Sequence, residues 1–543
     1  MVHRLFDTAD VVLRIARLVL ALERQADMRR HRPEYLAVLA RLCRVCRPLH
    51  ATLQPIIHSH LLLSVRVEPR RSALRTLAAS WISARPASPR APVAQAVRRS
   101  VSRVRTIVVD LLSHAEPGQL REHFADSGFC AQPWPRATCV FVRVSPDAIK
   151  SPGCVVAQAL ALVFEHARFV SSVYVMRSGP TNYAEPELDV RRVLGAQAKW
   201  VRSLCVGDGF RCQISECPVP LAELALTLCA QTSDAQLELL RRVCASVRRL
   251  ELREITPRDL DCVVAGVEFG CLQRLRICLC THAILSGASA AGLLDAGPGR
   301  DPRFPRLRQM RFEGYYQTAP PILLRALAAA APLLDHLHMD LTIRNSAELE
   351  VWRIPRLRRL DMRTTVGVDV QPALDALFAC GQTLDIVAVA SHGRVEGCVP
   401  ESLHLERVRE LWLADVCVPL PHVWRLVRSL PLLVQLEATV LYEAGQDMLL
   451  ETDDGLATIA EHIEPVLASR LELLALSHRR DVLVAQRISR LGVQLMALLC
   501  SLPALRRFRG RDCKSTVEAF VARMLDDHQV ARVADHLRRL DVC

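Results

Sequence analysis

The sequence predicts an α/β protein in which a small N-terminal helical module precedes a curved solenoid, with one strand and one helix in each repeat. Three observations support this prediction. The first 63 residues place apolar side chains at helical spacing. A six-residue apolar pattern recurs in sixteen copies from residue 104 onward, and helix-like segments separate the copies. Recurrence at such intervals is typical of solenoids.

The composition indicates an intracellular folded protein. Half of the 543 residues are hydrophobic and only 5% are aromatic, so the core is expected to consist mainly of Leu, Val, Ala and Cys. The 20 cysteines are scattered through apolar segments, and no apolar run is long enough to span a membrane. We therefore expect a reduced cytoplasmic or nuclear location and no membrane partner.

The positive charge is almost entirely arginine. The formal net charge is +13, and the 70 basic residues include only three lysines, at Lys150, Lys199 and Lys514. Guanidinium groups suit the recognition of carboxylate and phosphate. A GC-rich coding sequence would produce the same bias, so both interpretations stay open.

Residues 1–63 are predicted to form a helical module. Its first helix would present the apolar face Val11, Val12, Ile15, Leu18, Val19 and Leu22. Pro33 opens a second helix, with the apolar positions Leu36, Val38, Leu39, Leu42, Val45, Cys46 and Leu49. Residues 64–103 are rich in Arg, Pro, Ser and Ala, which indicates a linker. Short helices are expected in "RRSALRTLAASWI" and "VAQAVRRSV" within it.

Residues 104–543 hold the repeats. The pattern is apolar-x-x-apolar-x-apolar, as in "VRRLEL" at 247, "LQRLRI" at 272 and "VRELWL" at 408. The last two apolar residues alternate with polar ones, which predicts a strand with one buried face. Segments such as "QPALDALFACG" and "PHVWRLVRSLP" are predicted helices between the strands. Each unit needs its neighbours to bury its apolar face.

This array resembles the leucine-rich repeat family over about 440 residues. In that family, Asn or Cys stands three residues after the last apolar position. Here that position holds other residues in most copies, including Ile255, Tyr315 and Thr342. The resemblance therefore implies an irregular solenoid with variable loops.

The whole chain resembles the fungal F-box/leucine-rich-repeat proteins. "DVVLRIARL" and "LARLCRVCRPLHATLQPIIHSHL" match the two parts of that family's F-box, and "LRTLAAS" matches its bridge to the repeats. Asp7-Thr8-Ala9-Asp10 replaces the usual opening Leu-Pro, so the F-box is degenerate. The resemblance implies a Skp-type adaptor and a cullin complex as partners. The implied adaptor-binding residues are Val11, Val12, Ile15, Leu39, Leu42, Val45 and Leu49.

A zinc site is an alternative interpretation of the same segment. The four possible ligands are Cys43, Cys46, His58 and His60. Cys46 lies on the apolar face of the second predicted helix, and Pro48 and Pro55 interrupt the segment. We therefore expect core cysteines and surface histidines, with no metal and no cofactor.

The resemblance implies a substrate-recognition subunit of a Skp/cullin/F-box ubiquitin ligase. The alternative is a non-ligase leucine-rich-repeat scaffold for protein interactions with a relic F-box. The basic run 85–105 lacks interleaved aromatics, so nucleic acid is not expected as a partner. We found no phosphate-binding loop or metal-ligand helix pair, and we expect no enzyme activity.

Cargo is expected on the inner, strand-lined face of the array, toward its C-terminal half. Residues that flank the last two apolar positions of each motif point away from the core, because strand side chains alternate. The predicted cargo-binding residues are Arg249, Arg274, Arg276, Arg311, Arg359, Arg363 and Trp412. Their chemistry favours acidic or phosphorylated protein substrates. The alternative is that Arg and Glu on adjacent strands pair across the ladder and only keep the surface soluble.

Overall fold

The computed structural model shows a mixed α/β fold of two compact units, Met1–Val263 (unit 1) and Val264–Cys543 (unit 2). The residues that it describes are 60–68, 71–78, 104–111, 117–126, 129–131, 133–144, 152–177, 187–195, 198–207, 210–213, 220–228, 233–264, 269–279, 304–318, 330–342, 356–364, 370–400, 403–441, 449–451, 470–477, 483–484, 487–510 and 539–542. The predicted helices of residues 1–59 lie outside this set.

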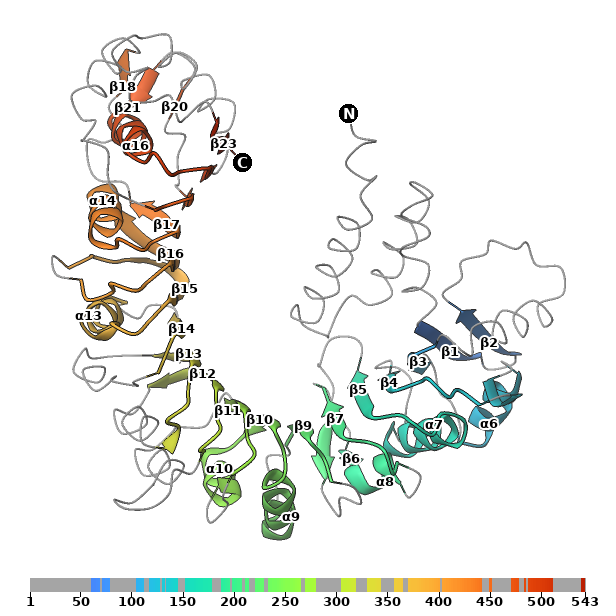
Figure 1. Ribbon diagram of the computed structural model, residues 1–543. Helices are drawn as coiled ribbons and strands as arrows, with labels where there is room; N and C mark the ends of the chain where they lie inside the picture. Colours follow the sequence, from blue (N-terminus) through green and yellow to red (C-terminus); the bar gives the residue numbers. More distant parts are fainter. Residues whose placement is uncertain are drawn as a thin grey trace, which may run out of the picture. The chain divides into compact units, whose positions relative to one another are not determined.

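Unit 1 is a parallel sheet with helices on one face (Figure 1). Its described strands are β1 (His60–Glu68), β2 (Arg71–Ala78), β3 (Thr106–Leu111), β4 (Cys139–Val144), β5 (Ser172–Arg177), β7 (Ser203–Val206), β9 (Glu223–Thr227) and β10 (Arg249–Ile255). They pair in the order β2-β1-β3-β4-β5-β7-β9-β10, and only β1–β2 is antiparallel. The helices are α6 (Pro117–Asp126), η1 (Phe129–Ala131), α7 (Pro152–His166), α8 (Val190–Leu194), α9 (Asp234–Cys244) and α10 (Pro257–Val264). A short parallel pair, β6 (Glu187–Asp189) and β8 (Arg211–Gln213), lies apart from this sheet.

Strands β1 and β2 correct the expectation for residues 70–82. A short helix was predicted there, but Arg71–Ala78 forms a strand that pairs antiparallel with β1. β1 in turn pairs in parallel with β3, so strand pairing begins upstream of the first predicted repeat. The paired neighbour, rather than the helix propensity of Leu and Ala, decides the structure of this segment.

Unit 2 repeats the same architecture. Its described main-sheet strands are β11 (Arg274–Leu279), β12 (Gln309–Thr318), β13 (His336–Thr342), β14 (Arg359–Thr364), β15 (Ile386–Glu396), β16 (Glu410–Pro419), β17 (Gln435–Leu441), β19 (Leu473–Ser477), β22 (Arg507–Gly510) and β23 (Asp541–Val542). All neighbours are parallel and follow chain order. The described helices are α13 (Gln371–Cys380), α14 (Leu420–Ser429) and α16 (Arg490–Cys500). A small antiparallel sheet holds β18 (Leu449–Glu451), β20 (Leu483–Val484) and β21 (Arg487–Ser489).

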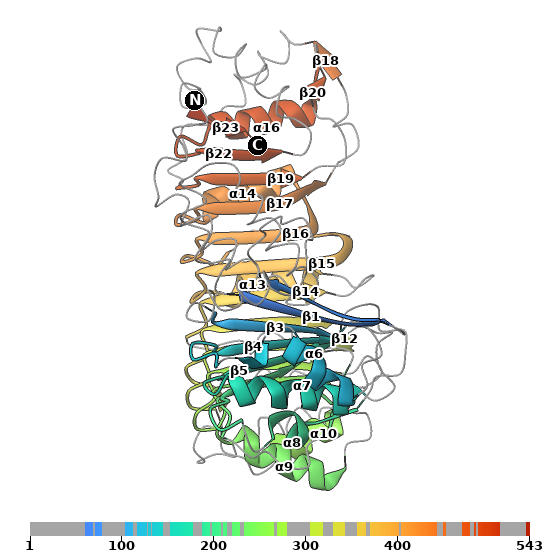
Figure 2. The same cartoon turned by 90° about the vertical axis from the view of Figure 1, so that its right-hand side faces the viewer.

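All sixteen copies of the predicted motif form strands, so the repeat interpretation of the fold is confirmed. Within each unit the strands lie like rungs (Figure 2). Backbone hydrogen bonds join the turns before successive strands, for example from Asp335 N–H to the Arg308 carbonyl at 2.9 Å and from Arg358 N–H to the Asp335 carbonyl at 2.9 Å. Pairing shifts register within β12–β13, β15–β16 and β16–β17, in keeping with an irregular solenoid.

The core lies between the sheet and the helices. In β16, Leu411 and Leu413 are fully buried and alternate with Trp412 on the other face. The predicted helices α13 and α14 are both present; α14 buries Leu420, Val423, Leu426 and Val427 at helical spacing. Gly381 is the residue directly after α13. A Cβ atom at this position would lie 2.8 Å from the Leu377 carbonyl oxygen. Among the described residues, no helix is both long enough and apolar enough to cross a membrane.

Candidate protein-interaction face

The candidate site is the inner face of unit 2, the face of its sheet opposite α13, α14 and α16 (Figure 1). Parallel pairing in register places equivalent residues of successive repeats side by side. One row contains Arg274, Gln309, His336, Arg359, Ile386, Glu410, Gln435, Leu473 and Arg507. The next row contains Arg276, Arg311, His338, Asp361, Ala388, Trp412, Glu437, Ala475 and Arg509. The face is therefore lined by side chains that are far apart in sequence.

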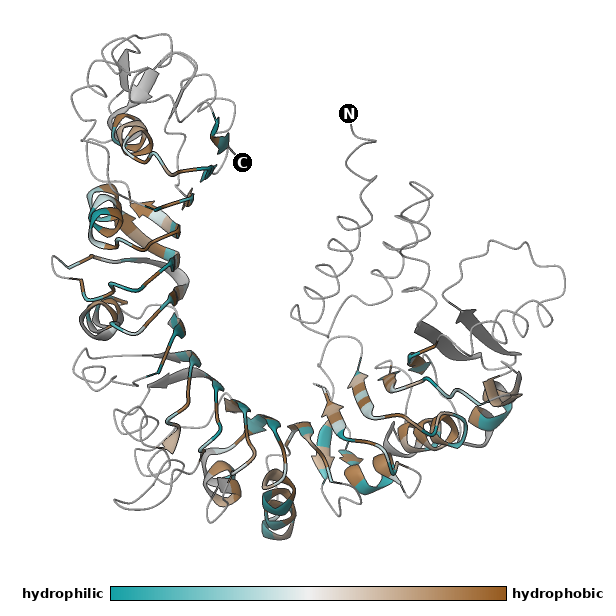
Figure 3. Ribbon diagram, in the orientation of Figure 1, coloured by the Kyte–Doolittle hydropathy of each residue, from teal (hydrophilic) through white to brown (hydrophobic). Residues whose placement is uncertain are grey.

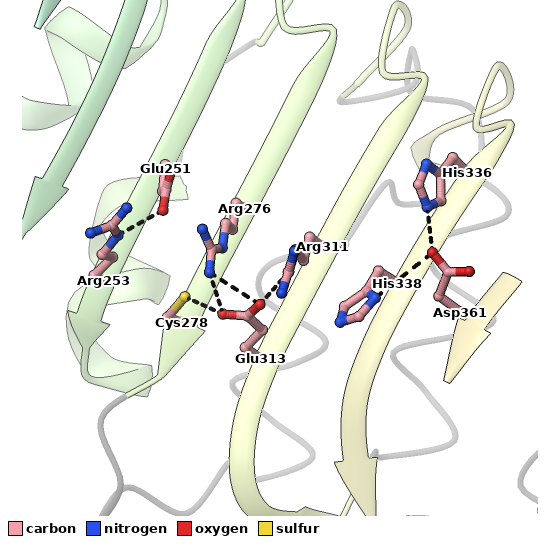
Figure 4. Close-up of polar contacts among 9 residues, drawn as sticks. All are labelled: Glu251, Arg253, Arg276, Cys278, Arg311, Glu313, His336, His338 and Asp361. Atoms are coloured by element: carbon pink, nitrogen blue, oxygen red, sulfur yellow. Dashed lines mark hydrogen bonds and ion pairs between the residues drawn. The ribbon is translucent and has the colours of Figure 1, made fainter. Parts of the chain in front are cut away.

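Glu313 organises the charges on β11 and β12 (Figure 4). Arg276 Nη2 donates to Glu313 Oε2 at 2.9 Å, and Cys278 Sγ lies 2.8 Å from the same oxygen. Arg311 Nε donates to Oε1. Burial alone would raise the pKa of Glu313, but the Cys278 thiol and the two guanidinium groups lower it to about 2. One carboxylate thus faces two arginines.

Asp361 plays the same part on β13 and β14 (Figure 4). His336 Nε2 lies 3.0 Å from Asp361 Oδ2, and Arg359 Nε donates to both carboxylate oxygens at 3.1 Å. His338 Nδ1 lies 3.9 Å from Oδ2. Burial opposes ionisation of Asp361, but the two imidazoles and Arg359 outweigh it and hold the pKa of this carboxyl well below its usual range.

Five arginines face three carboxylates at the inner-face positions of β11 to β14. These arginines are Arg274, Arg276, Arg311, Arg359 and Arg363, and the carboxylates are Glu313, Asp340 and Asp361. Arg274 and Arg363 are exposed, and neither side chain forms an ion pair or hydrogen bond with another described residue. Figure 3 shows hydrophilic residues on these strands. This part of the face keeps a positive excess after its internal pairing.

An apolar stretch follows on β15 and β16. Its half-buried residues are Ile386, Ala388, Ala390, Trp412 and Ala414. The guanidinium carbon of Arg359 lies 5.9 Å from the centre of the Trp412 ring, which is within cation–π range. This contact lies at the boundary between the basic strands β11 to β14 and the apolar strands β15 and β16. A ligand at this boundary would contact basic and apolar side chains next to each other.

The structure separates the predicted cargo residues into three groups. Arg276, Arg311 and Arg359 are paired with carboxylates of unit 2, as the soluble-surface alternative expected. Arg274, Arg363 and the Trp412 ring remain accessible in part or in full. Arg249 belongs to β10 of unit 1 and lies 3.5 Å from Glu223. The cargo-binding role of all seven residues stays a prediction.

The equivalent face of unit 1 carries an apolar row on β3 to β9, which was not predicted. Val108, Phe141 and Met176 are buried there, and the rings of Phe141 and Tyr174 stack with centroids 4.3 Å apart. The signal was present in the sequence. "VRTIVV" and "ATCVFV" are nearly continuous apolar runs, which indicates strands buried on both faces.

An ion pair between β3 and β4 lies on the same face. Arg143 donates two hydrogen bonds to Asp110, both at 2.5 Å. Burial raises the pKa of Asp110, although the charge of Arg143 and its hydrogen bonds oppose that effect. The pair was not predicted, because Asp110 and Arg143 are 33 residues apart.

The remaining predicted sites lie largely outside the described residues. All seven predicted adaptor-binding residues fall in residues 1–59, as do Cys43, Cys46 and His58. Within the described part of the chain, no group of three or more His, Cys, Asp and Glu side chains is arranged to hold a metal ion. The buried thiols of Cys212 and Cys244 have a raised pKa because burial disfavours the thiolate.

The comparisons with known proteins gave matches among solved structures. No protein-family model matches the chain, and no curated protein matches it. Among solved structures, the chain is similar to a chain in the crystal structure of the Rad7 and Elc1 complex in yeast. The match has 14% sequence identity and a TM-score of 0.31, and it covers 50% of this chain and 66% of the other.

Proposed function

We propose that this chain is a non-catalytic recognition subunit that holds protein cargo on the inner face of unit 2. We further propose that residues 1–63 bind a Skp-type adaptor, which would make the chain a substrate receptor of a Skp/cullin/F-box ubiquitin ligase. The cargo part of the proposal rests on the geometry of the face. The ligase part rests on the resemblance of the N-terminal sequence to an F-box.

The observation that carries the cargo proposal is the change of chemistry along one continuous surface. Strands β11 to β14 present an arginine excess, and strands β15 and β16 present Trp412 among small apolar residues. A half-exposed Trp beside Arg is the composition of binding hot spots. The matching cargo segment carries carboxylates or a phosphoryl group next to an apolar side chain.

Such a receptor needs no catalytic group of its own. It would hold the cargo close to a ubiquitin-charged partner enzyme and thereby raise the effective concentration of cargo lysines. The paired carboxylates Glu313 and Asp361 would keep the arginines oriented before cargo arrives, which lowers the entropy cost of binding. The scaffold alternative keeps the cargo face and omits the adaptor.

Co-purification of the tagged chain with a Skp-type adaptor distinguishes the ligase receptor from the non-ligase scaffold. We expect stoichiometric adaptor with the wild-type chain and none with Ile15→Asp or Leu42→Asp, because each puts a charge on a predicted apolar face. Circular dichroism of both variants would check that the chain is folded. Absence of adaptor from the wild-type chain would leave the scaffold function.

Cargo binding is tested separately with an Arg359→Ala, Arg363→Ala, Trp412→Ala variant. We expect this variant to lose cargo and to keep the adaptor, as measured by quantitative mass spectrometry of the purified complexes. Arg428→Ala on the exposed side of α14 is the matched control, because it removes an arginine from the helical face. Cargo lost from the control and kept by the triple variant would place the site on the helices.

A further inference from the structure

A second candidate surface lies on unit 1, along the turns that precede its strands. These turns comprise residues 104–105, 134–138, 167–171, 198–202, 220–222 and 245–248, and we call them the turn edge of unit 1. Hydrogen bonds between successive turns hold the edge in register, for example from Arg202 N–H to the Ser171 carbonyl at 2.8 Å. The edge is therefore a built surface and not a set of separate loops.

Two aromatic side chains stand out on this edge. Phe169 is 52% exposed and Trp200 is 54% exposed, and they are the exposed large hydrophobic side chains among the described residues. They occupy equivalent positions, because Ser172 of β5 and Ser203 of β7 are paired in the sheet. Phe169 lies three residues before Ser172, and Trp200 lies three residues before Ser203. Their ring centroids are 6.0 Å apart. The two rings thus form one apolar patch in solvent.

Basic side chains surround the aromatic pair. Arg105, Arg136, Arg168, Lys199, Arg202 and Arg248 are exposed along the turn edge of unit 1. No aspartate or glutamate occurs in the turns that form it. Glu165, just upstream in sequence, lies 3.4 Å from Arg121 of α6. The edge combines an apolar centre with a cationic rim that forms no ion pair within the described part of the chain.

The equivalent turns of unit 2 show that this composition is not a property of the repeat. There, Asp335, Asp385, Glu406 and Glu472 are interspersed with arginines. Arg407 lies 3.9 Å from Asp385, so cation and anion already compensate each other. The positions equivalent to Phe169 include Arg306, Arg356 and Arg407, which are not aromatic.

We propose that the turn edge of unit 1, centred on Phe169 and Trp200, is a docking site for an acidic protein segment that carries an aromatic or aliphatic anchor residue. The anchor would cover the two rings, and its flanking carboxylates would pair with the surrounding arginines and lysine. An apolar centre inside a polar rim is the arrangement found in protein-binding hot spots. This proposed site uses none of the residues assigned above to cargo or adaptor binding.

The geometry favours a protein segment over single-stranded nucleic acid. The rings are inclined at 45° and contact each other, so no slot between them admits a base. Single-strand sites stack successive bases on separate aromatic rings within a basic groove. A compact apolar patch instead suits one bulky side chain, with carboxylates placed around it.

An array of dodecapeptides tests the proposal with the full-length chain. Eight positions of each peptide are Asp or Glu, and the four central positions vary. We expect the chain to bind peptides with Phe, Leu or Trp at the central positions. Peptides with Gly and Ser at these positions should show no binding. Fluorescence anisotropy on the best peptide should show at least a tenfold weaker Kd for Phe169→Ala, Trp200→Ala, and for Arg168→Glu, Lys199→Glu.

Controls make the result decisive. Arg356→Ala, Arg407→Ala at the equivalent turns of unit 2 should bind the peptide as the wild type does. All variants change exposed side chains, and thermal unfolding would check that each is folded. Three outcomes would overturn the proposal. Gly-centred peptides could bind equally well, the aromatic double variant could bind peptide as the wild type does, or no peptide could bind at all. The proposal would also be overturned by a twelve-nucleotide thymidine strand that binds more tightly than any peptide and depends on the same two rings.

Discussion

The inner faces of the two units are built from the same motif and have opposite chemistry. In unit 1 the row Val108, Phe141, Tyr174, Cys205 and Ala225 is apolar and ends at Glu251 on β10. In unit 2 the corresponding row begins Arg276, Arg311, His338 and Asp361. Figure 3 shows the same change of hydropathy along the strands. The motif requires apolar residues at the core-facing positions and does not restrict the residue types at the alternate, inner-face positions.

The pKa shifts of Asp110 and Glu313 have opposite directions, in keeping with this difference between the two faces. Asp110 of unit 1 has a raised pKa because burial dominates over Arg143. Glu313 of unit 2 is also largely buried, yet its pKa is lowered to about 2, because a thiol and two arginines contact it. The same type of side chain on equivalent faces therefore contributes to stability with opposite dependence on pH.

The largest expected effect is the loss of an aromatic ring from the apolar face. Phe141 is 4% exposed and stacks on Tyr174. Phe141→Ala should lower the free energy of unfolding by about 3–5 kcal/mol. Trp412→Ala, in the same row of unit 2, should cost less, because its side chain is only partly buried. Urea unfolding of both variants measures the difference, and equal losses would remove the contrast between the faces.

The next effect concerns the carboxylate shared by Arg276 and Arg311. Glu313→Gln should cost about 1–3 kcal/mol at neutral pH, because the partly buried Arg276 and the exposed Arg311 lose their counter-charge. The pKa of Glu313 lies at about 2 in the folded state and 4.5 ordinarily. Its contribution is therefore complete above pH 4.5 and is lost as the pH falls toward 2.

Unfolding of the wild type and Glu313→Gln at several pH values measures this contribution. The gap between the two stabilities should shrink as the pH falls from 4.5 to 2. Arg276→Gln combined with Glu313→Gln should be less destabilised than the sum of the single variants, since the two groups act as a pair. A gap that does not change with pH would contradict the lowered pKa.

Asp110 should show the opposite slope. Because its pKa in the folded state is raised above the ordinary 3.8, the folded chain takes up a proton before the unfolded chain does. Stability of the wild type relative to Asp110→Asn should therefore increase as the pH falls from neutral toward 3.8. Chemical unfolding of both chains across that range measures the slope. A slope of the same sign as that of Glu313 would show that Arg143 outweighs burial.

The smallest effect is expected at Arg363. The exposed side chain of this arginine forms no ion pair or hydrogen bond with another described residue, so Arg363→Ala should change the free energy of unfolding by less than about 0.5 kcal/mol. In contrast, Arg359→Ala removes both the Asp361 pair and the Trp412 contact. Thermal unfolding of the two variants should rank Arg359→Ala as the less stable. The reverse order would argue that the cation–π and ion-pair contacts of Arg359 add nothing.

The sequence by itself determined the repeat. Every copy of the apolar motif became a strand, and two of the predicted helices, α13 and α14, are present where their apolar spacing placed them. Alternation along each strand also identified which residues of β11 to β14 lie on the inner face. These features follow from local periodicity, because a strand with one buried face needs an apolar residue at every second position.

Only the tertiary structure decided which of those side chains meet. Glu313 is bound by residues 35 and 37 positions earlier in the chain. Phe169, in the turn before β5, lies next to Trp200, in the turn before β7. β2 is a strand because β1 lies beside it and not because of its own residues. The motif aligns equivalent positions of successive strands. Which side chains along such a row form a contact depends on how they pack, and no local pattern in the sequence specifies those contacts.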